Sequence, residues 1–221
     1  MKVLVVDVGG THVKLLVSGR RVPIKLASGP ELTPRDMVRA VLEATADWTY
    51  DVVSIGYPGP VKNDKPVQEP ANLGKGWVGF NYAKAFKRPI HIVNDAAMQA
   101  FGSYEGGRML FLGLGTGLGA ALVWDGIVVP LELAHLPYQK GLSYEEYLGV
   151  AAIKRLGKKK WLHHVRHVVE LFSTALNADY VVLGGGNARL VEELPPKARL
   201  GSNMHAFRGG YRLWQARVRL T

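Results

Sequence analysis

The chain has 221 residues, of which 48% are hydrophobic and 21% are charged, proportions that are usual for a protein with a well-packed core. It contains no cysteine, which excludes disulfides, a thiolate nucleophile and cysteine-bound zinc. Lysine and arginine number 28 against 18 aspartates and glutamates, so the formal net charge of +10 raises the question of a polyanionic partner.

The first predicted elements are two strands joined by a glycine turn. Apolar runs at Val3–Asp7 and His12–Val17 indicate buried strands, and Val22–Leu26 indicates a third. Gly9-Gly10-Thr11 lies between the first two. Because glycine lacks a Cβ, we expect this turn to adopt positive φ and to point backbone N–H groups at an anion.

Asp7 lies at the end of the first predicted strand, beside that turn. A carboxylate there is suited to hold Mg²⁺ through water, because Mg²⁺ prefers oxygen ligands and keeps much of its hydration shell. A turn-forming aspartate that accepts local N–H groups is the alternative. The two glycines that follow favour the metal.

A helix and a strand come next, followed by a long loop. Thr33 and Pro34 signal a helix that extends to about Trp48, and Val52–Ile55 indicates a buried strand. Residues 61–80 are rich in turn residues but include large aromatic side chains. We therefore expect this loop to be ordered and functional.

A short strand at Ile90–Val93 leads into a helix that extends through Phe101. Asn94-Asp95 stands between them, where a helix-capping aspartate is the favoured interpretation of Asp95. A carboxylate at the end of a strand could also accept a proton from a sugar hydroxyl, since phosphoryl transfer needs one oriented base.

The second half of the chain repeats the strand-turn-strand unit. An apolar run that ends at Leu112 leads into a turn at residues 113–119, and a second run extends from Ala120 to Trp124. A shift of 106 positions places Asp7 on Gly113 and Gly9 on Gly115, which indicates an internal duplication. Two such turns are typical of a protein that holds a phosphate chain.

The remaining elements are helices at residues 143–156 and 158–177, a strand at Tyr180–Leu183 and a glycine loop at residues 184–187. The pair Glu132 and His135 precedes them, and a lone pair of this kind is more often structural than functional. The helix at residues 158–177 carries three histidines in a strongly basic setting, which favours surface imidazoles over a metal site.

Much of the basic excess gathers at residues 154–160 and 208–219. A solvated helix face with a basic tail is the simpler interpretation for any single residue. No nucleic-acid-binding motif accompanies these residues, so we expect no nucleic-acid partner, and a long inorganic phosphate polymer fits better. No apolar stretch reaches the length that spans a bilayer, and Asp7 interrupts the first apolar run. We expect no signal peptide, no membrane partner and a cytoplasmic location.

Seven short motifs, in this order and spacing, resemble the ROK family of sugar kinases. They are DVGGTHVK (7–14), GYPGPV (56–61), ANLGKGW (71–77), VNDAA (93–97), LGLGTGLGAALVWDG (112–126), ELAH (132–135) and LGGGNA (183–188). Within the family the resemblance is strongest to the polyphosphate glucokinases, which also lack the family's cysteine-rich zinc motif. No zinc is therefore expected.

The fold that this resemblance implies is α/β, a two-lobed actin-like ATPase (ribonuclease H-like) fold with a central cleft. The N-terminal lobe would span residues 1–106 and the C-terminal lobe residues 107–205. A C-terminal helix over residues 206–221 would return to the N-terminal lobe. A homodimer is expected on the same ground.

The activity that the resemblance implies is transfer of a phosphoryl group from polyphosphate or ATP to the 6-hydroxyl of glucose. Asp95 would be the general base, and Asp7 would hold Mg²⁺. The implied hexose-binding residues are Gly59, Asn72, Asn94, Glu132, His135 and Glu145, with Glu146 as the alternative to the last. The implied donor-binding residues are Asp7, Gly9, Gly10, Thr11, Lys14, Gly115, Thr116, Gly117, Gly185 and Gly186.

Three alternatives to a glucokinase stay open at this point. Pocket shape decides between hexoses, so a kinase for mannose or an N-acetylhexosamine has the same motifs. A sugar-sensing regulator of the same family would carry a helix-turn-helix before the first hairpin, which here begins at residue 3. A binding module without catalysis is disfavoured, because the aspartate, asparagine, glutamate and histidine positions are all occupied.

Overall fold

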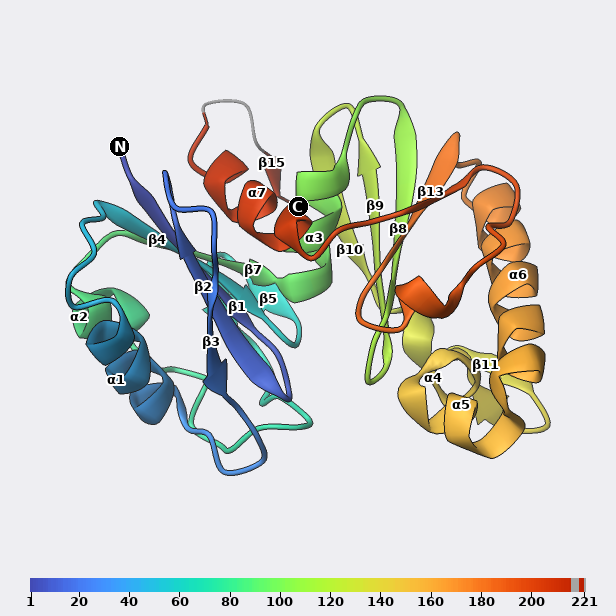
Figure 1. Cartoon of the computed structure of the whole chain (residues 1–221), viewed down its shortest axis with the longest axis horizontal. Coiled ribbons are helices and arrows are strands. Elements are labelled where there is room, and N and C mark those ends of the chain that lie inside the picture. The colour runs from blue at the N-terminus through green and yellow to red at the C-terminus, as the bar shows by residue number, and fades with distance from the viewer. Residues whose placement is uncertain (216–218, 221) are drawn as a thin grey trace. The chain divides into compact units, whose positions relative to one another are not determined.

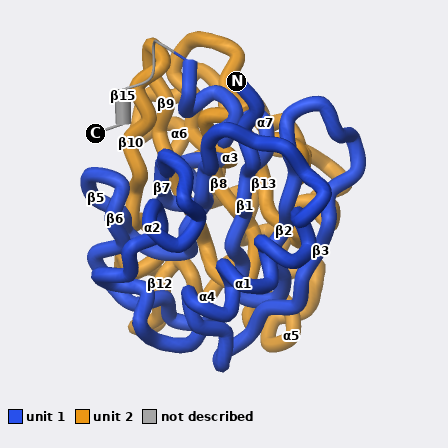
Figure 2. Tube along the Cα trace, turned by 90° about the vertical axis from the view of Figure 1, so that its left-hand side faces the viewer, with its two compact units in different colours: residues 1–98, 206–216 blue, residues 99–205, 217–221 orange. Residues whose placement is uncertain are grey.

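The computed structural model describes residues 1–215 and 219–220 of the chain (Figure 1). The chain divides into two compact units, coloured separately in Figure 2. The first comprises Met1–Met98 and a segment that begins at Ala206, and the second comprises Gln99–His205 and the last strand. Over the described residues, we find no helix whose length and apolar character would suit a membrane crossing.

The first unit is built on a five-stranded sheet of order β3-β2-β1-β4-β7. β1 (Val3–Val8), β2 (His12–Val17) and β3 (Ile24–Ala27) form an antiparallel meander. β4 (Val52–Tyr57) and β7 (Ile90–Asn94) continue the sheet from β1 in parallel. Every residue of β1 and β4 is buried, as expected for central strands of an α/β sheet.

Helix α1 (Pro34–Ala44) follows β3 and contributes to the core of the first unit. Thr33 caps it by accepting the N–H of Asp36, and proline at its first position has no N–H group that would need a partner there. The helix ends at Ala44, so the prediction that it extends to about Trp48 is wrong by one turn. Trp48 is buried beyond its end.

The long loop of the first unit is ordered around buried aromatic side chains. It contains a small hairpin of β5 (Val61–Lys62) and β6 (Lys65–Pro66), and helix α2 (Tyr82–Phe86) follows it. Trp77 is fully buried, with its ring centroid 5.8 Å from that of Tyr57 at the end of β4. The expectation of an ordered loop is confirmed.

Helix α3 (Asp95–Ser103) follows β7, and α7 (Met204–Arg212) joins the first unit from Ala206 onward. The hydroxyl of buried Ser54 on β4 donates to the carbonyl of Gly210 over 2.7 Å and accepts Trp214 Nε1 at 2.9 Å. The C-terminal helix expected over residues 206–221 ends at Arg212, which corrects that prediction. Residues 216–218 and 221 of the expected helix lie outside the described residues.

The second unit is built on a six-stranded sheet of order β14-β13-β8-β9-β10-β15. Its strands are β8 (Arg108–Leu114), β9 (Leu118–Trp124), β10 (Ile127–Leu131), β13 (Tyr180–Gly184), β14 (Ala198–Leu200) and β15 (Arg219–Leu220). The first three form an antiparallel meander, and β13 and β14 continue from β8 in parallel. This repeats the connectivity of the first sheet.

The register of the two sheets confirms the internal duplication. Asp7 on β1 pairs with Gly56 on the neighbouring parallel strand β4. At the equivalent place, Gly113 on β8 pairs with Gly184 on β13. The shift of 106 positions therefore holds in three dimensions, with a carboxylate at one of the two equivalent positions and glycine at the other.

The helical part of the second unit covers residues 144–175 as α4 (Tyr144–Leu148), α5 (Val150–Leu156) and α6 (Lys158–Ala175). A single helix over residues 143–156 is therefore a wrong prediction. The break falls at Gly149, where a Cβ would approach the carbonyl oxygens of Thr116 and Glu145 to 2.6 and 3.0 Å. Short elements complete the unit: η1 (Leu133–His135), β11 (Pro137–Gln139), β12 (Leu142–Ser143) and η2 (Ala188–Leu190).

Candidate functional site

Asp7 and Lys14 form an ion pair across the first hairpin. They are direct partners in the antiparallel register of β1 and β2, and Lys14 Nζ lies 3.0 Å from Asp7 Oδ2. The Asp7 side chain is only 6% exposed and that of Lys14 is 29% exposed. The Asp7 carboxylate is therefore nearly buried and has an ammonium group as its ion-pair partner.

In the first glycine turn, the glycines allow the backbone to lie close to a neighbouring loop, and they do not adopt positive φ. Neither Gly9 nor Gly10 has positive φ, which corrects the expectation for this turn. The N–H of Gly9 donates to His12 O over 3.0 Å and closes the hairpin. A Cβ on Gly10 would lie 3.3 Å from Cβ of Asn72, so the absence of a side chain lets the turn lie against the Asn72 loop. Thr11 is exposed at the tip.

Asn94 is the residue that caps helix α3. Its Oδ1 accepts the N–H of Ala97 over 3.0 Å, and its Nδ2 donates to the carbonyl of Gly59 over 3.2 Å. The side chain therefore ties the end of β7 to the turn after β4. This contact brings Asn94 and Gly59, two of the predicted hexose ligands, to one place.

The side chain of Asp95, by contrast, is not the cap of helix α3. Its Oδ1 accepts the N–H of the next residue, Ala96, over 2.8 Å, and the carboxyl group also accepts the N–H of Asp95 itself. Asp95 is partly exposed as a residue, yet burial of the carboxyl group is the largest cause that raises its pKa from 3.8 to about 7. The negative charge of Asp7 raises the pKa further, and Lys14 lowers it. The interpretation of Asp95 as the helix cap is therefore wrong.

The Asn72 loop is held by residues that the sequence reasoning did not single out. Both oxygens of Glu69 accept backbone N–H groups, those of Trp77 and Val78, over 3.1 and 3.2 Å. The Tyr57 hydroxyl donates to Gln68 O over 2.7 Å, and burial raises the pKa of that hydroxyl. Glu69 lies among turn residues, where the sequence has no helical or strand periodicity that would single it out. Its role in holding the loop is visible only in the structure.

The donor set beside Asp7 fits a hydrated Mg²⁺ ion. Mg²⁺ is commonly held by one or two carboxylates, with waters and substrate phosphates completing its shell. Asp7 offers one oxygen that Lys14 does not bind, and the pKa of Asp95 responds to the charge of Asp7. No cluster of three or more histidine, aspartate or glutamate side chains able to hold a metal occurs in residues 1–215 and 219–220.

The second glycine turn is fastened within the second unit by Asn187. Its Nδ2 donates to Gly115 O over 2.9 Å, and its N–H donates to Leu114 O over 2.9 Å. These bonds hold the loop at Gly185 and Gly186 against the turn. Gly185 has a φ of +81°, a left-handed conformation that favours glycine, whereas neither Gly115 nor Gly117 has positive φ.

Glu145 lies directly against Gly117. A Cβ on this glycine would meet the Glu145 carboxylate, whose Oε1 would be 3.1 Å away. Glu146 instead closes a capping box at the start of α4, where its Oε2 accepts the N–H of Ser143 over 2.8 Å. The geometry thus favours Glu145 over Glu146 as the residue beside the second turn.

Glu132 and His135 are exposed at the two ends of η1. Glu132 makes no side-chain capping bond to this turn. Of the three histidines on α6, His163 and His167 are exposed, and His164 Nδ1 lies 3.0 Å from the Tyr138 hydroxyl. Burial and neighbouring cationic groups lower the pKa of His164, as expected for an imidazole in a basic setting.

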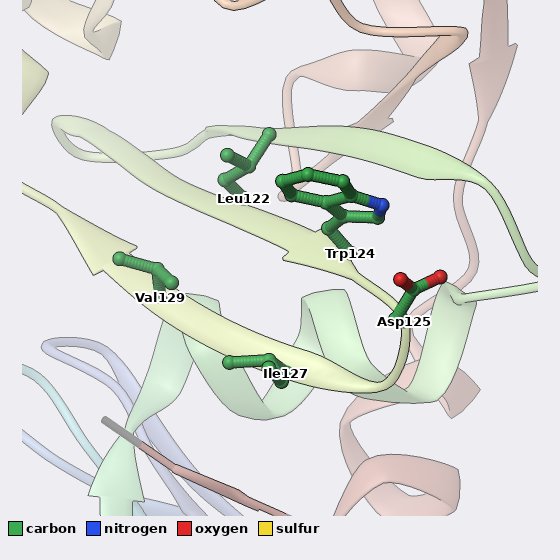
Figure 3. A pocket seen from close by; sticks show the side chains of 5 residues that line it. All are labelled: Leu122, Trp124, Asp125, Ile127 and Val129. Carbon is green, nitrogen blue, oxygen red and sulfur yellow. The ribbon is translucent and has the colours of Figure 1, made fainter.

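A separate apolar pocket lies on one face of the β9–β10 hairpin (Figure 3). Its lining residues are Leu122, Trp124, Asp125, Ile127 and Val129. It contains none of the predicted site residues. It offers a single carboxylate and no arrangement of catalytic groups, so we assign it no chemistry.

Comparison with known proteins gives one family match and many relatives. The model of the ROK family matches residues 3–130. A polyphosphate glucokinase of Mycobacterium tuberculosis (strain CDC 1551 / Oshkosh) is 26% identical over 217 residues, which cover 86% of this chain and 80% of the relative.

Solved structures share the fold. An inorganic polyphosphate/ATP-glucomannokinase from Arthrobacter sp. strain KM is 22% identical with a TM-score of 0.79, over 95% of this chain and 96% of that one. A ROK family glucokinase from Streptomyces griseus, in complex with glucose and AMPPNP, is 18% identical with a TM-score of 0.74. The match covers 96% of this chain and 99% of that one. The α/β actin-like fold class expected from the sequence is confirmed.

Proposed function

Because this chain belongs to the ROK family, we propose that it is a sugar kinase that transfers a phosphoryl group from polyphosphate or ATP to the 6-hydroxyl of glucose. The observation that carries the proposal is Asp95: a carboxyl group without a capping role, with a pKa raised to about 7, beside the Asp7–Lys14 pair. A base of this kind is what transfer to a hydroxyl requires.

Asp95 acts as the general base in this proposal. A pKa near 7 lets the carboxylate be present at neutral pH and still accept a proton, which is the balance that favours general-base catalysis. Proton transfer from the 6-hydroxyl to Asp95 leaves an alkoxide oxygen that attacks the terminal phosphorus of the donor. The donor's bond to its leaving phosphate breaks in the same displacement.

Asp7 and Lys14 organise the donor side of the first unit. Lys14 supplies a positive charge that offsets the negative charge of donor phosphates, and it fixes one oxygen of Asp7. The other Asp7 oxygen would hold Mg²⁺ through water, and the bound ion would neutralise donor charge. The turn residues Gly9, Gly10 and Thr11 complete the proposed donor contacts.

The proposed hexose ligands in the first unit are Gly59, Asn72 and Asn94. Asn94 keeps hydrogen-bonding capacity beyond its two protein contacts, because an amide offers two donors and two acceptor lone pairs. Glu132, His135 and Glu145 are the proposed hexose ligands of the second unit. Its proposed donor residues are Gly115, Thr116, Gly117, Gly185 and Gly186, which Asn187 connects.

The identity of donor and hexose is tested by one product assay. Purified protein is incubated with glucose, mannose or an N-acetylhexosamine, and with ATP or long-chain polyphosphate, and sugar phosphate is measured. We expect glucose 6-phosphate with polyphosphate, and a second signal with ATP. Absence of sugar phosphate in every combination would contradict the kinase proposal.

A homodimer and a cytoplasmic location accompany the proposal. Light scattering on the purified protein tests the first, and we expect twice the chain mass of 24.2 kDa. A mass equal to one chain would contradict the dimer without affecting the proposed reaction. Fractionation of source cells tests the second, with the protein expected in the cytoplasmic fraction.

A further inference from the structure

The segment from His135 to Gly141 is anchored in the core of the second unit by a single side chain, that of Tyr138. Every other residue of this fully described stretch is exposed, whereas Tyr138 is half-buried and packs against the apolar core. The pairing of β11 with β12 adds little, because its register comprises two residue pairs with an irregularity at Tyr138 between them. A hairpin this short needs other contacts to hold it in place.

Tyr138 contacts both of the helices that lie beside β11. Its ring centroid lies 4.6 Å from that of Tyr144 and 5.0 Å from that of Tyr147, and both of these tyrosines are buried on α4. On α6, the His164 ring lies 5.6 Å away, and its Nδ1 lies 3.0 Å from the Tyr138 hydroxyl. Burial raises the pKa of this hydroxyl, so it stays protonated at neutral pH and can donate to a neutral imidazole. Aromatic packing and a hydrogen bond therefore hold β11 against α4 and α6 together.

The same part of the chain carries the three hexose ligands proposed for the second unit. Glu132 and His135 lie at the two ends of η1, and Glu145 directly follows Tyr144. The N–H of Tyr144 donates to Leu136 O over 3.1 Å. This bond joins the residue after His135 to the residue before Glu145, so the placement of Tyr144 affects both ligands.

The Asn72 loop of the first unit is held differently. Asn72 is followed by buried Leu73, and Pro70 and Trp77 on either side of it in sequence are also buried. Several core side chains therefore share the task of fixing Asn72. The segment around Tyr138 depends on one.

We propose that Tyr138 is a positioning residue for hexose binding: its ring, packed on α4 and α6, holds His135 and Glu145 in the arrangement that binds the sugar. The inference rests on the proposed function, because it concerns the hexose ligands of that reaction. Tyr138 itself touches neither the donor nor the reacting atoms in this proposal. Its loss should therefore weaken sugar binding and leave the chemical step largely intact.

The test compares variants of Tyr138 with a matched control. Tyr138→Ala removes the ring and the hydroxyl, whereas Tyr138→Phe keeps the ring. The control is Tyr50→Ala, because Tyr50 is also a half-buried tyrosine packed on the core of its unit, and it lies at the other end of β4 from Gly59. Steady-state kinetics with glucose or donor varied, calorimetric glucose binding and thermal unfolding are measured for each protein.

We expect Tyr138→Ala to raise the KM and the Kd for glucose roughly tenfold, on the scale of one lost hydrogen bond to the sugar. The kcat and the KM for the donor should change less. Tyr138→Phe should restore most of the glucose affinity, because it keeps the ring packing. Tyr50→Ala should lower Tm without raising the KM for glucose.

An unchanged glucose KM in Tyr138→Ala, or an equal rise in the control, would overturn the inference. If Tyr138→Ala does not fold, Tyr138→Leu takes its place, since it keeps much of the bulk and removes the aromatic contacts and the hydroxyl. The same rise in glucose KM is expected for it, and an unchanged value counts against the positioning role in the same way.

Two outcomes separate this inference from the proposed function. If the wild type makes sugar phosphate and the Tyr138 variants bind glucose as tightly as it does, the kinase proposal stands and the positioning role is contradicted. If the wild type itself makes no sugar phosphate from any of the hexoses, the kinase proposal is contradicted, and the inference that rests on it is overturned with it.

Discussion

Asp95 has a chemical environment that a helix cap does not require. Asn94 caps the helix through the N–H of Ala97, and the Asp95 carboxyl adds a hydrogen bond from the N–H of Ala96. Its burial and the nearby negative charge of Asp7 both oppose ionisation. Ionisable groups whose surroundings oppose ionisation are common at functional sites, where residues serve the reaction and lower the stability of the fold. The environment of Asp95 therefore supports its proposed role as the general base.

The neighbours of Asp95 should shift its pKa in opposite directions. Asp7→Asn removes a negative charge and should lower the Asp95 pKa from about 7. Lys14→Gln removes a positive charge and should raise it. Carbon NMR of the Asp95 carboxyl group follows the titration directly and does not depend on activity. Shifts of the same sign in both variants would contradict the described arrangement.

The raised pKa also predicts how stability depends on pH. The folded protein holds the Asp95 proton up to about pH 7, whereas the unfolded chain releases it near 3.8. The stabilising contribution is complete below the lower value and is lost as pH rises through the upper one. Asp95→Asn should therefore raise Tm relative to the wild type at pH 8. The gain should be smaller at pH 4, and a pH-independent difference would speak against the raised pKa.

At the scale of elements, strands were easier to predict than the breaks between helices. The buried runs in β1, β2 and β4 are set by local hydrophobicity, which a sequence displays. Gly149, at the break between α4 and α5, lies against the carbonyl oxygens of Thr116 and Glu145, and Thr116 is far away in sequence. The motif positions could be predicted from family resemblance. Which of Asn94 and Asp95 caps α3 could not be predicted, because both residue types cap helices well.

Asn187 should control the donor side of the second unit. Asn187→Ala removes the bond to Gly115 O, so the glycine loop and the second turn lose their side-chain connection. We expect the KM for the phosphoryl donor to rise about tenfold, on the scale of one lost hydrogen bond. Steady-state kinetics with either substrate varied will show this, with the KM for glucose as the internal control. An increase in the glucose KM alone would contradict the assignment.

At the scale of the whole molecule, two units share one sheet connectivity but differ in chemistry. The register places Asp7 and Gly113 at equivalent positions, so a single duplication supplied two glycine turns and only one carries a carboxylate. The sequence displays the repeat as a shift of 106 positions. It does not display how the end of the chain packs, because the contact of α7 with β4 joins residues that are 156 positions apart.

The packing of α7 predicts a specific sensitivity to side-chain size. A Cβ on Gly210 would lie 2.6 Å from two methyl carbons of Val5, so Gly210→Ala forces the helix away from the sheet. We expect a loss of about 1–3 kcal/mol in the free energy of unfolding. Adding Val5→Ala makes room, so the double variant should lose less than the sum of the single losses. Additive losses in urea unfolding would contradict this contact.

The role of Asp95 as the base of a sugar kinase can be tested by comparing the wild type with one variant. Turnover and glucose affinity are measured for the wild type and for Asp95→Asn, which keeps the size of the side chain and removes its basicity. We expect kcat to fall by roughly 10²-fold or more in the variant, while the Kd for glucose stays nearly constant. Unchanged turnover in the variant would contradict it.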